Sequence, residues 1–259
     1  MGFMRETDTI TIYWSPASFL TSHSSWNILY SKPKSVLTEL HRNKIPGAYM
    51  GQCPATKNLM NNVFSFHAAV DDEFDIPEKH FHKEPTIEDK DDIIMQVNSV
   101  AGMYHERPTS FDGYIDVIYG MSWLFFADEP VVARMTAPYF PVHTPMEGAL
   151  LAPGEFDIGR WYRSFNLDYH IPKTTRHFSL KAGDPLFFME VMTDKKVVFK
   201  RYMMDQELMN ITREMVDAPK RYGARKSLEH RYESAANAMI PEIVLNQIKK
   251  NVIEDHASE

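Results

Sequence analysis

The alternation in residues 161–171, WYRSFNLDYHI, restricts the fold of this chain more than any other feature of its sequence. One set of alternate positions is mainly bulky and apolar: Trp161, Arg163, Phe165, Leu167, Tyr169 and Ile171. The intervening set is mainly polar: Tyr162, Ser164, Asn166, Asp168 and His170. Successive side chains of a β-strand point to opposite faces of a sheet, so the pattern predicts a strand with one buried and one polar face. Pro172 ends this strand, because proline cannot donate to a β-ladder.

The segment after this strand predicts three more strands. Residues 177–180 can pair as a short strand, and the glycine of the following KAGDP fits a turn because glycine tolerates positive φ. The apolar run 185–192 predicts a buried strand, which the polar stretch TDKK links to residues 197–202. We expect these last two strands to form a hairpin, and the interval 161–202 to consist of adjacent antiparallel strands.

The first third and the middle of the chain predict strands joined by turns, with one helix. The expected strands are residues 9–14, 63–70, 93–103, 114–126 and 131–136, of which 93–103 begins with a run that also fits a helix. Residues 35–44 predict a helix with Ser35 as N-cap. Residues 71–92 are highly charged and contain two prolines, which indicates an exposed insertion.

The sequence changes character near residue 204, where helical spacing begins. Asp205 is a good N-cap for a helix that Pro219 interrupts, a second helix is expected at about 224–238, and a third begins near Pro241. We therefore predict a mainly β core over residues 1–204, a sandwich or a β-clip-like fold with the insertion at 71–92. A helical C-terminal extension over residues 205–259 makes the chain α+β overall.

Composition limits the cellular compartment and the classes of partner that we expect for this protein. The chain has 259 residues, with 28 basic against 35 acidic side chains and a net charge of −7, which disfavours nonspecific binding to nucleic acid or to a membrane. Its one cysteine, Cys53, cannot form an intramolecular disulfide, and the N-terminus lacks the apolar run of a signal peptide. We expect a soluble, unsecreted protein.

The common catalytic motifs are missing from the sequence. It contains no G-x-x-x-x-G-K-[ST], G-x-G-x-x-G or G-x-S-x-G pattern, so the catalytic residues stay unknown. We predict no metal site and no cofactor, and interpret His80 and His82 as a solvated histidine pair in a charged loop. The alternative is that both are metal ligands, since imidazoles at i and i+2 of a strand point to one side.

The strand at 161–171 and the residues just before it supply the candidate ligand-binding side chains. The set consists of Asp157, Tyr162, Arg163, Asn166 and Asp168. A carboxylate, a phenol and a guanidinium beside a sheet could recognise a base, a sugar hydroxyl and a phosphate. They also fit ordinary structural polar groups, and an arginine on an apolar face often has a buried partner.

Four stretches of the chain resemble a family of proteins from tailed bacteriophages and bacteria. They are GQCPATKN, SWLFFADEP, GEFDIGRWYRSFNLDYHI and KAGDPLFFMEVMTDKKVVFKRY, which span much of residues 50–215. This resemblance implies no activity. The pair FDIGRWYRSF and LKAGDPLFF is more remotely similar to the Asp-x-x-Tyr-Arg strand and Gly-Asp turn of dUTPase-like β-clip proteins. Here Tyr162 follows Asp157 by five positions instead of three, and the glutamine after the turn is missing.

These observations lead to one functional expectation and two alternatives. We expect a non-catalytic, phage-encoded binding or interaction protein, with a protein partner or self-association, in the host cytoplasm or the virion. One alternative is a β-clip-type enzyme that binds or hydrolyses a small nucleotide with Mg²⁺ through Asp157, Tyr162 and Arg163. The other is a cupin-like metal-dependent enzyme that uses His80 and His82.

Overall fold

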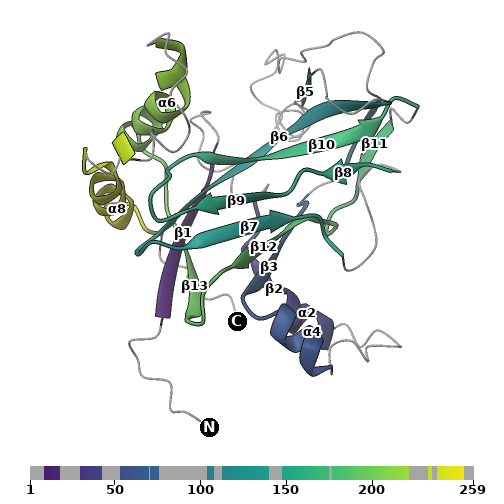
Figure 1. The fold of residues 1–259 in the computed structure, drawn as a ribbon, viewed down its shortest axis with the longest axis horizontal. Coiled ribbons are helices and arrows are strands. Elements are labelled where there is room, and N and C mark those ends of the chain that lie inside the picture. The colour runs from purple at the N-terminus through teal and green to yellow at the C-terminus, as the bar shows by residue number, and fades with distance from the viewer. Residues whose placement is uncertain are drawn as a thin grey trace.

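A computed structural model of the protein shows thirteen strands and four helices within the residues that it describes. The described residues are 9–17, 30–42, 53–69, 71–75, 104–107, 113–139, 148–174, 177–221, 233–234 and 238–253. Two β-sheets pack face to face, and helices cover parts of their outer surfaces (Figure 1). The prediction of a mainly β sandwich with C-terminal helices is confirmed.

The first sheet has six strands. Its order is β13 (Lys196–Arg201), β1 (Thr9–Pro16), β6 (Tyr114–Ala127), β10 (Ser164–Pro172) and β8 (Leu150–Leu151), with β5 (Tyr104–Arg107) also paired to β6. All its pairs are antiparallel except β1 with β13, which run parallel. The long strand β6 holds the sheet together, because it pairs with β1, β5 and β10.

The second sheet has five antiparallel strands. Its order is β2 (Lys34–Ser35), β3 (Val63–His67), β12 (Pro185–Val191), β7 (Val132–Thr136) and β9 (Gly154–Asp157). A separate two-stranded pair consists of β4 (Asp72–Asp75) and β11 (His177–Leu180). Strand β4 lies at the start of the predicted charged insertion, and residues 76–92 of that insertion lie outside the described residues, as do His80, His82 and all of 93–103.

Aromatic side chains from both sheets meet in the core. Phe66 on β3 and Phe187 on β12 stack with their ring centroids 4.4 Å apart. Trp123, on β6 of the first sheet, lies edge-on to Phe187 at 5.0 Å. The predicted alternation holds along β10, where Phe165, Leu167, Tyr169 and Ile171 are buried in this core. The strand begins at Ser164, three residues later than predicted.

The predicted hairpin of 185–192 and 197–202 is wrong. Both segments are strands, but β12 lies in the second sheet and β13 in the first, where β13 pairs with β1. Strand β11 likewise pairs with β4 instead of β12. The physical reason is burial: almost every residue of β12 is buried, which suits the middle of a sheet, whereas Lys196 and Lys200 of β13 are exposed and suit an edge.

Helix α2 (Val36–Arg42) packs on the outer face of the second sheet. Its N-terminus is capped as predicted, since the Ser35 hydroxyl accepts the Thr38 N–H at 3.4 Å. Val36 joins Val63 and Phe188 in a small cluster on that face. The short helix α4 (Pro54–Leu59) follows Cys53. The cluster of Val36, Val63 and Phe188 covers the β3 side of the sheet.

The C-terminal helices pack on the outer face of the first sheet. Helix α6 (Gln206–Arg221) contributes Leu208 and helix α8 (Ile240–Lys250) contributes Val244 and Ile248 to a cluster that includes Leu124 and Phe126 of β6. The extension after residue 204 is therefore joined to the β core by a shared cluster. None of the helices in the described part of the chain is long and apolar enough to cross a membrane.

Two predictions about these helices have different outcomes. The third helix begins next to Pro241 as predicted, with Val244 and Ile248 on its buried face. The interruption at Pro219 is wrong, because α6 continues to Arg221. A proline in the last turn removes only one backbone hydrogen bond before the helix ends. Most of the predicted helix at 224–238 lies outside the described residues.

Asp205 connects the two helices. Its Oδ1 accepts the Leu208 N–H at 2.9 Å as an N-cap, and its Oδ2 accepts from the side-chain amides of Gln247 and Asn251 on the α8 side. Burial raises the pKa of this carboxyl, but these hydrogen bonds, together with one from the Glu207 backbone, outweigh burial and hold the pKa below its usual value.

We expect Asp205→Ala to lower the free energy of unfolding by about 1–3 kcal/mol, because it removes the N-cap and leaves two amides without their acceptor. The matched control is Glu214→Ala, an exposed acidic position on the same helix, for which we expect a change within about 0.5 kcal/mol. Urea unfolding measures both values. Equal stabilities of the two variants would contradict the connecting role of Asp205.

Candidate functional site

Asp157 ends β9 and takes part in the turn that follows. Its Oδ1 accepts the Gly159 N–H at 3.2 Å, and its Oδ2 lies 3.6 Å from Nε of Arg160. Its backbone carbonyl accepts the Trp161 N–H at 2.9 Å. These contacts give the carboxylate a local structural role at the point where the chain leaves the second sheet for the first.

Tyr162 is fully buried, contrary to its predicted place on a polar strand face. It precedes the first residue of β10 and lies on the same outer face as Ser164, because Leu124, the register partner of Ser164, belongs to the same cluster as Tyr162. The C-terminal helices bury that end of the face. Its hydroxyl lies 2.9 Å from that of Tyr202 and 3.1 Å from the sulfur of Met204. Burial raises the pKa of the phenol well above its usual value. The hydroxyl is therefore neutral and already hydrogen-bonded inside the cluster beneath the C-terminal helices.

The other three predicted residues, Arg163, Asn166 and Asp168, lie on β10 or directly before it. The Arg163 guanidinium lies over the Trp161 ring, 5.4 Å from its centroid, in a cation–π contact between two half-buried side chains. Asn166 and Asp168 occupy β10 positions that alternate with the buried Phe165 and Leu167, so they share the outer face of the first sheet as predicted. Tyr162, Asn166 and Asp168 thus lie on one face of the first sheet, whereas Asp157 lies in the turn after β9 and Arg163 packs on Trp161.

A larger organised group of charges lies on the outer face of the second sheet. Arg134 of β7 is in register with Glu190 of β12 on one side and with Glu155 of β9 on the other. Its Nε and Nη2 each lie 2.8 Å from Glu155 Oε1, and its Nη1 lies 3.1 Å from Glu190 Oε2. We call these three residues the charge ladder.

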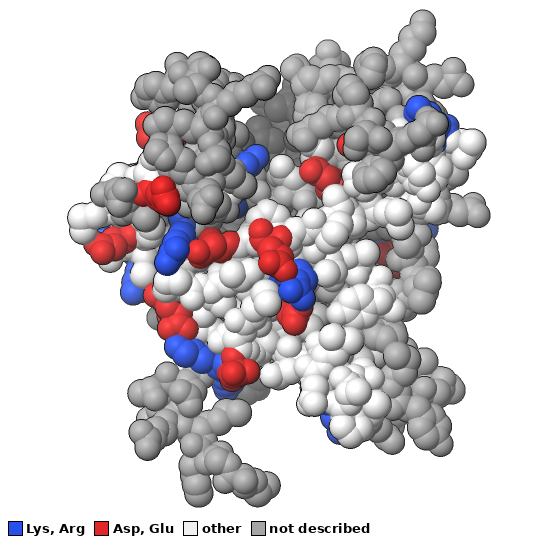
Figure 2. All heavy atoms as spheres, viewed as in Figure 1, with Lys and Arg blue, Asp and Glu red and all other residues white. Residues whose placement is uncertain are grey.

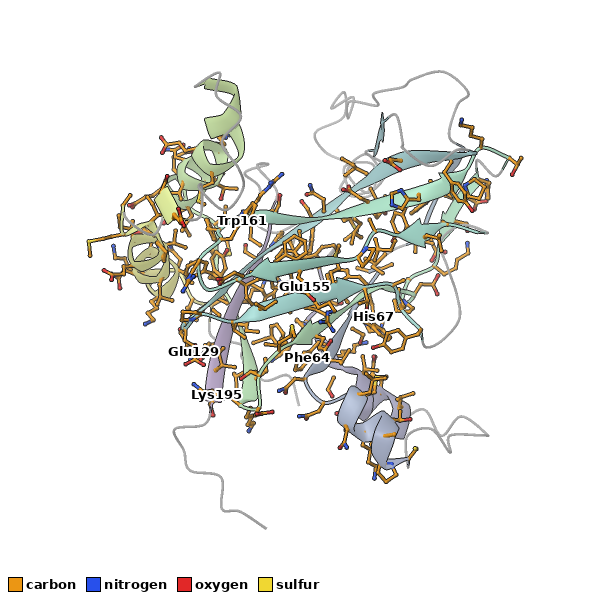
Figure 3. The ribbon with its side chains drawn as sticks, viewed as in Figure 1. Phe64, His67, Glu129, Glu155, Trp161 and Lys195 are labelled. Carbon is orange, nitrogen blue, oxygen red and sulfur yellow. The ribbon has the colours of Figure 1, made fainter. Side chains whose placement is uncertain are left out.

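The charge ladder is exposed and held in place by the strands beneath it. The side chains of Glu155, Arg134 and Glu190 are 56%, 38% and 33% exposed. Figure 2 views this face, where red and blue groups meet near the centre and mainly uncharged residues surround them, and Figure 3 labels Glu155 there. The hydrogen bond and charge of Glu155, with a contribution from Glu190, raise the pKa of Arg134.

Sequence reasoning missed the charge ladder, although one signal was present. Arg134 is the one charged residue of the strand VARMT, and Glu190 is the one charged residue of PLFFMEV. A single charge in an apolar strand indicates a position that faces solvent or a partner charge. Only the strand order 12-7-9 shows that these charges lie side by side.

A second polar group lies under α2 on the same sheet. Ser65 and His67 are two residues apart on β3, and their common partner is Glu39 of α2. The Ser65 hydroxyl contacts Glu39 Oε2 and lies 3.1 Å from the Lys34 carbonyl oxygen, while His67 Nε2 lies 3.3 Å from Glu39 Oε1. His67 Nδ1 is buried without a hydrogen-bond partner. Figure 3 labels His67 on this sheet.

The described residues do not assemble a metal centre or a nucleophile with its base. No group of three or more His, Cys, Asp or Glu side chains in the described ranges could hold a metal ion. Cys53 is exposed before α4, and backbone hydrogen bonds from Thr56 and Ala55 lower the pKa of its thiol. In the Ser65 group the carboxylate contacts both serine and histidine, so the imidazole is not placed between them as a general base requires.

Comparison with known proteins gives no relative. The chain matches no protein-family model, no curated protein and no solved structure.

His67 makes the stability of the α2 contact depend on pH. Burial lowers the pKa of its imidazole more than the carboxylates of Glu39 and Asp184 raise it, and Lys34 lowers it further. A histidine with a lowered folded-state pKa binds fewer protons in the folded than in the unfolded chain. Its contribution to stability is therefore complete above the unfolded pKa of about 6.5 and decreases as the pH falls below that value.

We expect the free energy of unfolding to fall between about pH 7.5 and pH 5.5, and to fall less in His67→Gln, which cannot take up the proton. Urea unfolding at both pH values measures the two slopes. Because the comparison is between slopes, a constant loss of stability in the variant does not affect it. Identical slopes would show that His67 is not the titrating group.

Proposed function

We propose that the protein is a non-catalytic binding or interaction protein that contacts a protein partner through the outer face of its second sheet. The observation that carries this proposal is the charge ladder, three partly exposed charged side chains fixed in register on neighbouring strands.

Stability alone does not account for the charge ladder. Exposed ion pairs typically contribute about 0–1 kcal/mol, since water screens them and their side chains lose entropy. Charges held in one geometry are more effective in recognition, where they set the orientation of a partner and exclude partners of the wrong charge. A hydrogen bond and a second ion-pair contact with Glu155, together with a hydrogen bond to Glu190, hold Arg134 in such a geometry.

The outer face of the first sheet is less suited to binding a partner. There, α6 and α8 bury Leu124 and Phe126 of β6 within the chain itself. On the second sheet, α2 covers Val63 and Phe188 and leaves the β7 and β9 side with its charges exposed. The ladder carries two carboxylates and one guanidinium, so its net charge is negative. A partner that places a basic side chain over Glu155 or Glu190 complements it.

The resemblance of the chain to tailed-phage proteins supports a role in assembly or in the virion. A binding surface on a rigid β-sandwich suits such a component, because rigid partners lose little conformational entropy on association. Mass spectrometry of purified particles tests this part of the proposal, and particles without the chain would contradict the virion role.

We expect Glu155→Gln with Glu190→Gln to weaken capture of the partner by about tenfold, because the two changes remove the charges and keep the side-chain shapes. The matched control is Glu214→Gln with Glu242→Gln, the same chemical change on α6 and α8. The tagged wild type and both variants are compared by quantitative mass spectrometry, and the captured protein is then purified and titrated against each. Equal affinity for all three would contradict the proposed surface.

Thermal unfolding with dUTP or dCTP and Mg²⁺ tests the nucleotide alternative. We expect no rise in melting temperature, since the Tyr162 hydroxyl and the Asp157 carboxylate are already hydrogen-bonded within the protein. A rise that Arg163→Ala abolishes would favour a nucleotide-binding protein over the present proposal.

A further inference from the structure

Strand β13 is an edge of the first sheet, and its backbone groups alternate between its neighbour and the outside. The Tyr202 N–H donates to the Trp14 carbonyl of β1 at 3.1 Å. In a parallel ladder alternate residues point the same way, so Lys200 and Val198 also face β1. The N–H and C=O groups of Val197 and Phe199 therefore face away from β1. Figure 1 shows β13 beside β1 at the margin of the sandwich.

An added strand already begins at one end of this edge. After α8 the chain returns to β13, where Val252 pairs antiparallel with Tyr202. The Ile253 N–H donates to the Arg201 carbonyl at 2.8 Å, and the Met203 N–H donates to the Asn251 carbonyl at 2.9 Å. The edge thus accepts an antiparallel strand, and these bonds define its register. Within the described ranges no strand pairs with the outward side of Val197 and Phe199.

The side chains along this edge indicate what a further strand would carry. Val197 and Phe199 are half-buried against the core, and the Phe199 ring meets Phe64 of the second sheet at 4.7 Å. Lys196 and Lys200 are exposed, four residues apart on the opposite face of the strand. An added strand would place apolar side chains beside the first pair and would meet two cations on its other face.

We propose that the β13 edge binds an extended acidic segment of a protein partner by antiparallel strand addition. This inference rests on the proposed function and names a second contact of the same partner class. Main-chain hydrogen bonds to Val197 and Phe199 supply affinity, and carboxylates opposite Lys196 and Lys200 supply selectivity. A second copy of β13 is disfavoured as the occupant, since lysines would then face lysines. Lysines on an edge strand prevent pairing of like strands for the same reason.

The test uses the peptide Val-Glu-Val-Thr-Val-Glu-Val, whose glutamates have the spacing of Lys196 and Lys200. Its matched control replaces both glutamates by lysine. We expect fluorescence anisotropy to show binding of the acidic peptide at least about tenfold tighter than the basic one. We also expect hydrogen exchange of the Val197 and Phe199 amides to slow at saturation. Equal affinity for the two peptides would overturn the proposal.

Two variants separate the backbone contact from loss of packing. Val197→Pro removes the outward N–H and is compatible with an edge strand, whereas Val197→Ala shortens the side chain and keeps the N–H. We expect the first to weaken peptide binding by about tenfold relative to the second. Equal binding by both variants would overturn strand addition. A wild-type dimer in light scattering that Val197→Pro converts to a monomer would assign the edge to a second copy, and it would also overturn the proposal.

The outcomes distinguish this inference from the proposed function. If the wild type binds no acidic peptide while capture of its partner still depends on Glu155 and Glu190, strand addition is wrong and the proposed function stands. If the acidic peptide binds with the expected dependence on Val197 while the Glu155 and Glu190 changes leave partner capture unaltered, strand addition at β13 is supported. The proposal that the charge ladder contacts the partner is then wrong.

Discussion

The contact of Phe66, Phe187 and Trp123 is the interaction on which the rest of the structure depends. Phe66 and Phe187 come from neighbouring strands of the second sheet, and Trp123 comes from the long central strand of the first. An aromatic group of this size buries a large apolar area and fixes ring geometry, so it sets both the separation and the alignment of the sheets. The faces turned away from this contact are then left to the helices and to solvent.

The sequence was sufficient to predict several of the long strands, but it missed short ones such as β5 and β9 and was insufficient to predict which strands pair. Alternation along 161–171 and the apolar run at 185–192 predicted β10 and β12, because side-chain period is a local property. Pairing depends on which sheet can accept a strand. Strand β12 is buried on both faces and lies between β3 and β7, while β13 carries exposed lysines and lies at an edge. The difference in burial between residues 185–192 and 197–202 was visible in the sequence, and it argues against a hairpin of these two strands, since hairpin strands share one sheet.

The candidate site was less predictable for a related reason. Alternation placed Tyr162 on the outer face of the strand, but it could not show that α6 and α8 cover this end of the face and bury the phenol. The charge ladder is not local in sequence, because more than fifty positions separate Arg134 from Glu190. No local pattern links them, and only the order of β12, β7 and β9 brings them into register.

The same architecture limits where a partner can bind. The outer face of the first sheet is partly occupied by α6 and α8, and that of the second by α2, which leaves the β7 and β9 side with its ladder. At the end of β9, the Asp157 carbonyl accepts the N–H groups of Arg160 and Trp161. Within the described residues, the outward side of β13 is paired near Tyr202, where Val252 meets it. The lysines of β13 disfavour a like strand at this edge, whereas an acidic strand meets attraction instead of repulsion there.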